Sequence, residues 1–373
     1  MIYFDNSSTT YFKPPEVISS VAATLKNLSV NAGRAGHSLA IKAATALNDT
    51  RAKAADFFEC EIEKTIFTYG CTDSLNMAIF GSVVRDGHVI TTAFEHNSTL
   101  RPLYSLYNDG QIDLTVVYPK ADGKIYAEQI LSAIKKNTYL IALNSVSNVT
   151  GLALPVENVG KSVKDSRILL LVDGAQSAGY RKYNYSLFDM YAVAPHKGLH
   201  APQGIGILTL SNRVNLRPTR LGGTGTMSQS VIQPIDLPES LESGTLPLPA
   251  IIGLNAALTY TKHNGEKGSK RIAVLGEYLY NRLKALSGIT VYTADPSAGI
   301  IAFNADKLDS VTCADMLDKA GFCLRSGLHC APLLHKFYGT LKKGMVRASL
   351  GVDNTFFEID LFIEAIEKIL QKL

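Results

Sequence analysis

Two polar residues, each placed after an apolar run, could work together chemically. The run Ile168–Val172 is followed directly by Asp173, and the run Met190–Ala194 is closely followed by Lys197. Ligands of open parallel sheets bind beyond the carboxyl ends of the strands, so both side chains are expected at one site. A lysine in a pocket can form a Schiff base, and a buried carboxylate can keep a pyridine nitrogen protonated, which is the pairing that pyridoxal phosphate requires. Taken singly, Asp173 could be a helix cap and Lys197 a solvated surface charge.

Two further strand ends could complete such a cofactor site. Thr65–Tyr69 leads into Gly70-Cys-Thr-Asp-Ser74 at the start of a helical stretch, where backbone N–H groups and the helix dipole favour a phosphate. The same small polar residues could simply cap the helix. His88–Thr92 leads to His96, whose ring could lie on the face of an aromatic cofactor, although a lone histidine is more often structural.

A second cluster of reactive residue types lies near the C-terminus. The segment Arg325-Ser-Gly-Leu-His-Cys330-Ala-Pro places a cysteine between Gly, His and Pro, and His335 and Arg347 follow. Cationic neighbours favour the thiolate of such a loop cysteine, which is its nucleophilic form, whereas a buried cysteine would be inert. Zinc ligation by Cys323, His329, Cys330 and His335 is a weaker alternative, because the spacing matches none of the usual zinc motifs.

Length and composition indicate a globular protein with reduced thiols. At about 100–200 residues per domain, 373 residues predict about two domains. A net charge of +4, with 19% charged and 46% hydrophobic residues, does not indicate a nucleic-acid partner. No apolar run approaches the ~18 residues of a membrane span, and the first residues lack the features of a signal peptide, so we expect no membrane partner and a cytoplasmic location. The five cysteines include no CxxC pair, and Cys60 and Cys313 are expected to be buried and inert.

Alternating strand and helix patterns are predicted to position these residues. From about residue 40 to 210, segments rich in Ala, Leu, Lys and Glu alternate with short apolar runs, which is typical of α/β units around a mostly parallel sheet. The predicted strands are Thr65–Tyr69, His88–Thr92, Leu114–Tyr118, Tyr139–Leu143, Ile168–Val172, Met190–Ala194 and Ile205–Leu210. Together they could form one seven-stranded sheet, preceded by a long helix over Leu39–Phe58.

The amino-acid composition changes after the last predicted strand of this sheet. Leu221–Pro249 is dense in Gly, Thr, Ser and Pro and is predicted to be a long loop, and such loops usually serve a site or an interface. Helices are predicted over Ile251–Tyr260, Gly276–Leu286 and Phe356–Leu373, the last with Thr355 and Glu358 as a capping box. The C-terminal third is therefore expected to be a smaller α+β domain packed on the first.

In the order and content of its motifs, the sequence resembles the cysteine desulfurase and selenocysteine lyase family of the class V aminotransferase group. The resemblance covers nearly the whole chain, and the motifs are specific as a set although each is weak alone. They are Tyr3-Phe-Asp-Asn-Ser-Ser-Thr-Thr10, Asn31-Ala-Gly-Arg34-Ala-Gly-His37, Gly70-Cys-Thr-Asp73, Glu95-His96-Asn97, Ser147-Asn148-Val-Thr-Gly151, Asp173-Gly-Ala-Gln176, His196-Lys197, Glu242-Ser-Gly-Thr245, Arg325-Ser-Gly-Leu-His-Cys330-Ala and Arg347-Ala-Ser-Leu350. The compact Arg-x-Gly-x-His-Cys sequence resembles the branch with a short, ordered cysteine loop.

The resemblance implies pyridoxal 5'-phosphate as cofactor and a role for each matching residue around it. Lys197 would form the Schiff base, Asp173 would face the pyridinium nitrogen, Gln176 would donate to the ring oxygen and His96 would stack on the ring. The remaining cofactor-binding positions are Cys71, Thr72 and His196 at the phosphate, Asn148 near the ring, and Thr245, which would reach the phosphate of the neighbouring subunit's cofactor. Two hydroxyls common in the family are replaced by Ala194 and Cys71, which weakens the expected phosphate site.

The resemblance also implies residues that bind and transform the substrate. Lys197, Cys330 and His96 would be catalytic, with Cys330 as the nucleophile that accepts sulfur. Arg347 would bind the substrate carboxylate. Asn148, His37 and Arg325 fall at further substrate-binding positions. No metal is implied.

The implied protein is a homodimeric cysteine desulfurase of the fold type I architecture of pyridoxal-phosphate-dependent transferases. L-cysteine would become L-alanine, and the sulfur would pass as a persulfide to an acceptor whose identity the sequence does not reveal. Residues 1–12 would pack with the small domain, 13–258 would form the large cofactor-binding domain, and 259–373 the small domain carrying the catalytic cysteine. Three alternatives remain open: a selenocysteine lyase, an aminotransferase of a small amino acid, and a non-enzymatic sulfur-carrier scaffold.

Overall fold

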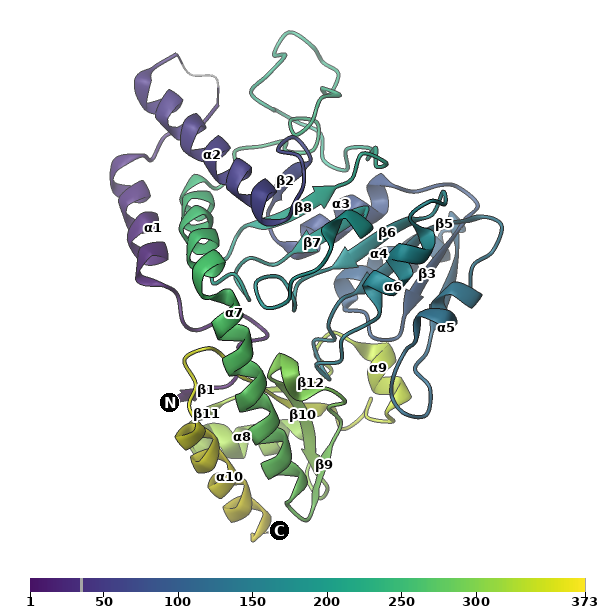
Figure 1. Ribbon diagram of the computed structural model, residues 1–373, viewed down its shortest axis with the longest axis vertical. Coiled ribbons are helices and arrows are strands. Elements are labelled where there is room, and N and C mark those ends of the chain that lie inside the picture. The colour runs from purple at the N-terminus through teal and green to yellow at the C-terminus, as the bar shows by residue number, and fades with distance from the viewer. Residues whose placement is uncertain (34–35, 373) are drawn as a thin grey trace.

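The computed structural model describes residues 1–33 and 36–372. Arg34 of the Asn31–His37 motif therefore lies outside the described residues. Two parts are visible in Figure 1: a large sheet with helices around it and a smaller sheet near both chain ends, with one long helix running from the first part to the second.

The large part is built on a seven-stranded sheet in the order β2-β8-β7-β6-β5-β3-β4. Its strands are β2 (Thr65–Thr68), β3 (Gly87–Thr92), β4 (Ile112–Val117), β5 (Thr138–Asn144), β6 (Leu169–Asp173), β7 (Met190–Val193) and β8 (Gly206–Leu210). All neighbouring pairs from β7 to β4 are parallel, whereas β8 runs antiparallel to both β7 and β2. Each of the seven predicted strands overlaps one strand of this sheet, which confirms the α/β class and the mostly parallel sheet.

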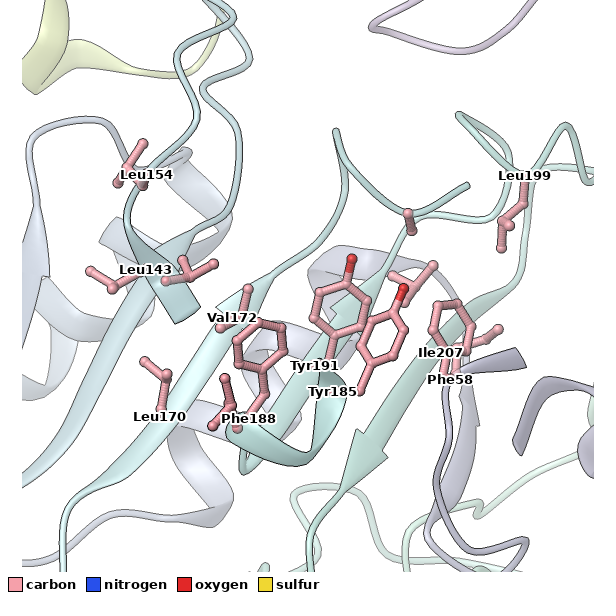
Figure 2. Close-up of a cluster of buried hydrophobic side chains, with 14 of the residues drawn as sticks. Phe58, Leu143, Leu154, Leu170, Val172, Tyr185, Phe188, Tyr191, Leu199 and Ile207 are labelled. Carbon is pink, nitrogen blue, oxygen red and sulfur yellow. The ribbon is translucent and has the colours of Figure 1, made fainter. Parts of the chain in front are cut away.

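Helices cover both faces of the sheet because successive side chains of each buried strand point to opposite sides. Leu170 and Val172 of β6 belong to one apolar cluster, and Leu171 between them belongs to another. The helices of this part are α1 (Pro15–Asn27), α2 (Ser38–Phe57), α3 (Cys71–Gly81), α4 (Asn97–Asn108), α5 (Ala127–Ser132), α6 (Val156–Val163) and the first half of α7 (Leu248–Lys284). Figure 2 shows the first cluster, where Tyr185, Phe188 and Tyr191 pack beside Phe58 of the turn after α2.

The small part is a four-stranded antiparallel sheet in the order β12-β13-β10-β9, with a two-stranded pair beside it. Its elements are β9 (Ile289–Val291), β10 (Ile300–Ala305), α8 (Ser310–Lys319), β11 (Phe322–Cys323), β12 (Arg325–Gly327), α9 (Pro332–Phe337), β13 (Met345–Ser349) and α10 (Phe356–Leu370). The N-terminal strand β1 (Ile2–Tyr3) pairs in parallel with β11, and Phe4 is fully buried in the core of the small part. The N-terminal segment is thereby anchored beside β13, which matters for the site.

Two predicted helices are the ends of one helix. Ile251–Tyr260 and Gly276–Leu286 both fall largely within α7, which continues through the residues between them. Gly265 allows a close approach there, because a Cβ at this position would lie 3.0 Å from the carbonyl oxygen of Gly179. The predicted domain boundary between 258 and 259 falls inside this helix, so the domain limits remain a prediction.

Other sequence predictions hold at the level of single elements. Leu39–Phe58 corresponds to α2, and the predicted helix Phe356–Leu373 corresponds to α10, although Leu373 itself lies outside the described residues. Thr355 accepts a hydrogen bond from the N–H of Glu358, whose carboxylate accepts one from the N–H of Thr355, so the capping box is formed. The predicted loop Leu221–Pro249 contains neither helix nor strand from 221 to 247, whereas its last two residues, Leu248 and Pro249, already belong to α7. No helix in the described ranges combines the length and apolar character needed to cross a membrane.

Candidate active site

A cavity of about 240 Å³ lies beyond the carboxyl ends of the parallel strands. This is the position at which open α/β sheets bind ligands. Eight of the nine predicted cofactor-binding residues line it: Cys71, Thr72, His96, Asn148, Asp173, Gln176, His196 and Lys197. The order of the strands brings these residues together, because β6, β7, β5 and β3 all end at the same edge of the sheet.

Asp173 and Lys197 face this cavity from neighbouring strand ends. Asp173 is the last residue of β6 and is 6% exposed, and its Oδ1 accepts a hydrogen bond of 2.9 Å from the N–H of Ala175. Burial lowers the pKa of Lys197, and the Asp173 carboxylate opposes this shift. A lysine whose pKa is lowered by burial is more readily neutral, and a neutral amine can act as a nucleophile or a base.

Cys71 lies next to the same carboxylate. Its Sγ is 3.6 Å from Oδ1 of Asp173, and burial together with the charge of Asp173 raises the pKa of the Cys71 thiol well above its usual value. Cys71 is therefore a neutral thiol in this site and no rival to Cys330 as a nucleophile.

The N-terminus of α3 closes one end of the cavity. Gly70 precedes this helix with a φ of 138°, a conformation that favours glycine, and the first residues of the helix, Cys71 and Thr72, line the cavity, so the free N–H groups of the helix end lie beside it. The hydroxyls of Thr72 and Ser98 are 2.7 Å apart beside it. Ser98 was not identified from the sequence, yet it supplies a hydroxyl near the place where Ala194 and Cys71 lack one.

Two histidines at the cavity are neutral. Burial is the main cause that lowers the pKa of His96 to about 4, and burial with the nearby Lys197 lowers that of His196 to about 4. Nδ1 of His96 accepts a hydrogen bond from the N–H of Ser98, which fixes the ring at the start of α4. Nδ1 of His196 is buried and has no partner among the described residues.

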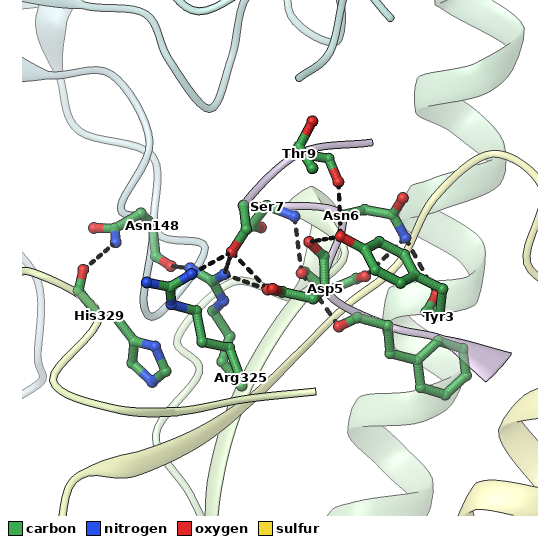
Figure 3. Close-up of polar contacts among 12 residues, drawn as sticks. Tyr3, Asp5, Asn6, Ser7, Thr9, Asn148, Arg325 and His329 are labelled. Carbon is green, nitrogen blue, oxygen red and sulfur yellow. Dashed lines mark hydrogen bonds and ion pairs between the residues drawn. The ribbon is translucent and has the colours of Figure 1, made fainter. Parts of the chain in front are cut away.

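Arg347 lies at the centre of a polar network that joins the two parts of the chain. It is 2% exposed on β13, and its Nη1 donates to the carbonyl oxygen of Asn148 at 2.8 Å. Its Nη2 donates to Asp5 Oδ1 at 2.7 Å and to the hydroxyl of Ser8 at 2.8 Å. Arg325 also donates to the Ser8 hydroxyl, and Figure 3 shows Asp5, Arg325 and Asn148 converging on this network. The Nε–H of Arg347 is buried without a partner among the described residues, so it can bind an incoming anion.

The loop that carries Cys330 lies against the start of α4. Cys330 is exposed, and its carbonyl oxygen accepts a hydrogen bond of 2.7 Å from the N–H of Asn97, the residue next to His96. The carbonyl oxygen of His329 accepts a second, also 2.7 Å, from the side chain of Asn148. Both residues have positive φ angles, 48° for His329 and 57° for Cys330, so the loop depends on these bonds to hold an uncommon conformation.

Besides Arg325, Cys330 and Arg347, two exposed predicted site residues, His37 and Thr245, are absent from the lining of the cavity. His37 is exposed at the N-cap of α2, where its Nδ1 accepts a hydrogen bond from the N–H of Ala40. Thr245 is exposed on the long loop, and its carbonyl oxygen accepts a hydrogen bond from the hydroxyl of Tyr69, which does line the cavity. A site role for either residue would require a second subunit and remains a prediction.

The residues of the cavity fit pyridoxal phosphate. Asp173 and Lys197 supply the carboxylate and the amine, and the start of α3 supplies an anion-binding helix end. Oδ1 of Asn148 and Nδ1 of His196 are buried polar atoms that still lack partners among the described residues, as expected of atoms that would contact a bound group. In the described ranges, no group of three or more His, Cys, Asp or Glu side chains could hold a metal ion.

Comparisons with known proteins identify related sequences and folds. The family model described as aminotransferase class-V matches residues 2–362. A protein of Methanothermobacter thermautotrophicus named probable cysteine desulfurase is 32% identical, with 99% of this chain and 94% of that protein aligned. A cysteine desulfurase of Yersinia pseudotuberculosis is 28% identical, with 99% and 93% aligned.

Solved structures give the same result for the fold. The apo structure of a cysteine desulfurase from Thermococcus onnurineus NA1 superposes with a TM-score of 0.90 and 28% sequence identity, over 100% of this chain and 95% of that one. The superposition covers the whole chain, so the overall fold corresponds to that of this cysteine desulfurase.

Proposed function

The chain belongs to the aminotransferase class-V family, and from this premise we propose that it is a pyridoxal-phosphate-dependent cysteine desulfurase. It converts L-cysteine to L-alanine and transfers the sulfur, as a persulfide on Cys330, to an acceptor. The observation that carries the proposal is the position of Cys330. It is an exposed cysteine whose carbonyl oxygen is bonded to the residue after His96, and His96 lines the same cavity as Asp173 and Lys197.

Family membership makes the enzyme pyridoxal-phosphate-dependent. When bound, pyridoxal phosphate supplies an electron-poor ring that draws electrons away from the substrate Cα. Asp173 would keep the ring nitrogen protonated, and Gln176, whose side-chain amide donates to the carbonyl oxygen of Ser7, stands beside it. Thr72, Ser98, His196 and the first N–H groups of α3 would hold the phosphate.

Arg347 would bind the substrate carboxylate. A planar guanidinium binds a carboxylate through two parallel hydrogen bonds. The two donors on one edge of Arg347 are Nε, which has no partner among the described residues, and Nη2, whose hydrogen bonds are accepted by Asp5 and Ser8. Substrate binding would therefore replace part of the contact with Asp5 or Ser8. Arg325, bonded to Ser8, would be a second cation near the carboxylate.

Lys197 would take the proton from the substrate Cα, since burial favours its neutral form. The Cys330 thiolate then attacks Sγ of the substrate cysteine: the S–S bond forms, the Cβ–Sγ bond breaks, and the electron pair left on Cβ takes up a proton to give the methyl group of alanine. The products are alanine and Cys330 persulfide. A second thiol takes the outer sulfur and returns Cys330 to its starting state.

One assay tests this function directly. The purified enzyme with its cofactor should release alanine from L-cysteine in the presence of a thiol, with sulfide in matching amount, and Lys197→Ala should abolish both. Selenocysteine assayed in parallel decides between sulfur and selenium preference. An enzyme that releases alanine from selenocysteine alone, or transfers an amino group without releasing sulfide, would contradict the proposal.

We further propose that the enzyme is a homodimer whose sites are shared between subunits. The long loop exposes a run of apolar side chains, with Val231, Ile232 and Ile235 at 103%, 76% and 90% exposure. Exposed apolar patches of this kind usually mark a protein interface. Thr245, further along the same loop and bonded to Tyr69 at the cavity, would then be placed to reach the phosphate in the neighbouring subunit.

We propose the cytoplasm as the place of action. All five cysteines are free, and a nucleophilic cysteine requires surroundings that keep it reduced. Recovery of the native protein from a secreted or periplasmic fraction with Cys330 in a disulfide would contradict this location.

A further inference from the structure

Two histidines are buried side by side beneath the cysteine loop. His329 is 5% exposed and His335, on α9, is fully buried, and their ring centroids are 5.8 Å apart. Nδ1 of His329 and Nε2 of His335 are both buried without a hydrogen-bond partner among the described residues. Unpartnered buried nitrogen atoms are costly, so two of them on adjacent rings require an explanation.

The outer nitrogen atoms of the pair do have partners, and these fix the direction of the bonds. Nε2 of His329 is 3.0 Å from the carbonyl oxygen of Met345, which can only accept, so Nε2 carries the proton. In a neutral imidazole Nδ1 is then a bare acceptor. At the other end, the hydroxyl of Thr340 is 2.8 Å from Nδ1 of His335 and 3.5 Å from the carbonyl oxygen of His335, and donation along the shorter contact leaves the His335 proton on Nε2.

We propose that Thr340, His335, His329 and the Met345 carbonyl form one directional hydrogen-bond chain that positions Cys330. The Thr340 hydroxyl donates to Nδ1 of His335, and Nε2–H of His329 donates to Met345. Between the rings, Nε2–H of His335 donates to Nδ1 of His329 through one water, since these two atoms share no direct hydrogen bond. This arrangement pairs the two unpartnered nitrogen atoms as donor and acceptor. The inference rests on the proposed function, because it assigns His335 and Thr340 as positioning residues for the sulfur-accepting cysteine.

The surroundings of the pair favour neutral rings, as the chain requires. Burial lowers the pKa of His329 well below its usual value. The cations Arg347 and Arg325 and the titratable ring of His335 lie near it, and burial lowers the pKa of His335 to about 4. Two neutral rings can form a chain of single hydrogen bonds, whereas a protonated ring would offer two donors to its neighbours and break the sequence. The hydrogen-bond chain is therefore expected to persist over the whole neutral pH range.

The chain links three elements around the reactive sulfur. Thr340 follows α9, Met345 begins β13, the strand that carries Arg347, and His329 immediately precedes Cys330. Because His329 and Cys330 both have positive φ angles, the bond from the His329 side chain to Met345 helps to hold the loop in this conformation. Loss of this hydrogen-bond chain should therefore displace Sγ of Cys330 without altering the cofactor cavity.

The first test reads the protons on the wild-type holoenzyme. In NMR spectra of the protein labelled with 15N-histidine, the two ring nitrogens of a neutral histidine differ strongly in chemical shift according to which one carries the proton. We expect both His329 and His335 to carry it on Nε2, with the His335 signals assigned by their loss in His335→Gln. A His335 proton on Nδ1 would overturn the proposal, because both central nitrogen atoms would then be acceptors.

The second test uses Thr340→Val with Thr340→Ser as its matched control. Valine keeps the shape of threonine and removes the donor, whereas serine keeps the hydroxyl. We expect Thr340→Val to lower kcat for sulfur transfer roughly tenfold, as expected for one lost hydrogen bond, with KM for cysteine and cofactor content within about twofold of wild type. Thr340→Ser should restore kcat. Equal kcat values in the two variants would overturn the proposal, and if valine prevents folding, the NMR result alone decides.

These readouts separate the chain from the function on which it rests. The ring protons can be assigned whether or not the protein releases sulfide. A protein with both protons on Nε2 but without desulfurase activity would refute the proposed function and support the chain. A protein with desulfurase activity but with the His335 proton on Nδ1 would support the proposed function and refute the hydrogen-bond chain.

Discussion

A buried ion pair attaches the long loop to α2, and removal of one partner of this pair should destabilise the protein strongly. Nη1 and Nη2 of Arg51 lie 2.6 and 2.7 Å from the two carboxylate oxygens of Glu242, in a bidentate pair. Both residues are buried, at 4% and 7% exposure. Arg51 also donates to the carbonyl oxygen of Thr65, and Glu242 accepts a hydrogen bond of 2.6 Å from the N–H of Phe67. Glu242→Leu therefore removes the partners of a buried guanidinium and of a strand N–H together.

The magnitude follows from what remains after the change. Arg51 would keep only the Thr65 carbonyl as an acceptor and would remain charged and buried, a situation that typically costs about 3–5 kcal/mol of folding free energy. The double variant Arg51→Met/Glu242→Leu removes both charges and should recover most of this loss, since buried pairs contribute little relative to apolar replacements. The large loss of stability is thus caused by a charge left buried without its partner, and not by a large net contribution of the intact pair.

Urea unfolding of the holoenzyme at one protein concentration measures this difference. The midpoint should fall strongly for Glu242→Leu, with an unchanged slope, and return in the double variant. Asp56→Asn is the control, because the Lys262–Asp56 pair has side chains 66% and 67% exposed and should contribute no more than about 1 kcal/mol. A loss below about 1 kcal/mol for Glu242→Leu, or an equal loss in the double variant, would refute the reasoning.

Three further outcomes are expected. Arg347→Lys should raise KM for cysteine roughly ten- to a hundredfold, because an ammonium cannot form the two parallel bonds of a guanidinium; steady-state kinetics with an unchanged KM would point to Arg325 as the anchor. Thr245→Val should weaken cofactor retention about tenfold or more, and dilution of the wild type to the monomer should also release cofactor. Light scattering follows the dimer and absorbance follows the cofactor; a monomer that retains the cofactor as tightly as the dimer would contradict a shared site. Alkylation at neutral pH should label exposed Cys330 first, whereas Cys313, whose pKa burial raises to about 11, should react only as the pH approaches that value; mass spectrometry that finds Cys313 labelled equally fast at pH 7 would contradict this order.

The strands of the large sheet could be predicted because their signal is local. Each is a short apolar run, and Ile168–Val172 is recognisable without reference to its neighbours. The unbroken course of α7 could not be predicted in the same way. Gly265 and Gly268 lie between its two apolar halves, and a glycine inside a helix usually weakens it. Here the close approach of Gly179 to Gly265 gives one of these glycines a packing role that only the folded chain shows.

The site residues that follow strands could be predicted from the sequence. The residues that reach the site from distant segments of the sequence could not. Asp173 directly follows a predicted strand, Lys197 and His96 stand within four residues of one, and the structure brings all three to one cavity. Asp5 and Ser8, which hold Arg347, were not identified, because their role depends on β1 packing beside the small sheet. Their only signal in the sequence is their place in the Tyr3–Thr10 motif.

The most direct test of the central claim is the mass of the cysteine peptides after one turnover. Holoenzyme mixed briefly with L-cysteine, without an acceptor thiol, and then alkylated should carry one additional sulfur on the peptide that contains Cys330. Cys330→Ser should carry none, although cysteine should still change its cofactor absorbance. Additional sulfur on the peptide of Cys60, Cys71 or Cys323 in place of Cys330, or sulfide release by Cys330→Ser at the wild-type rate, would contradict the account.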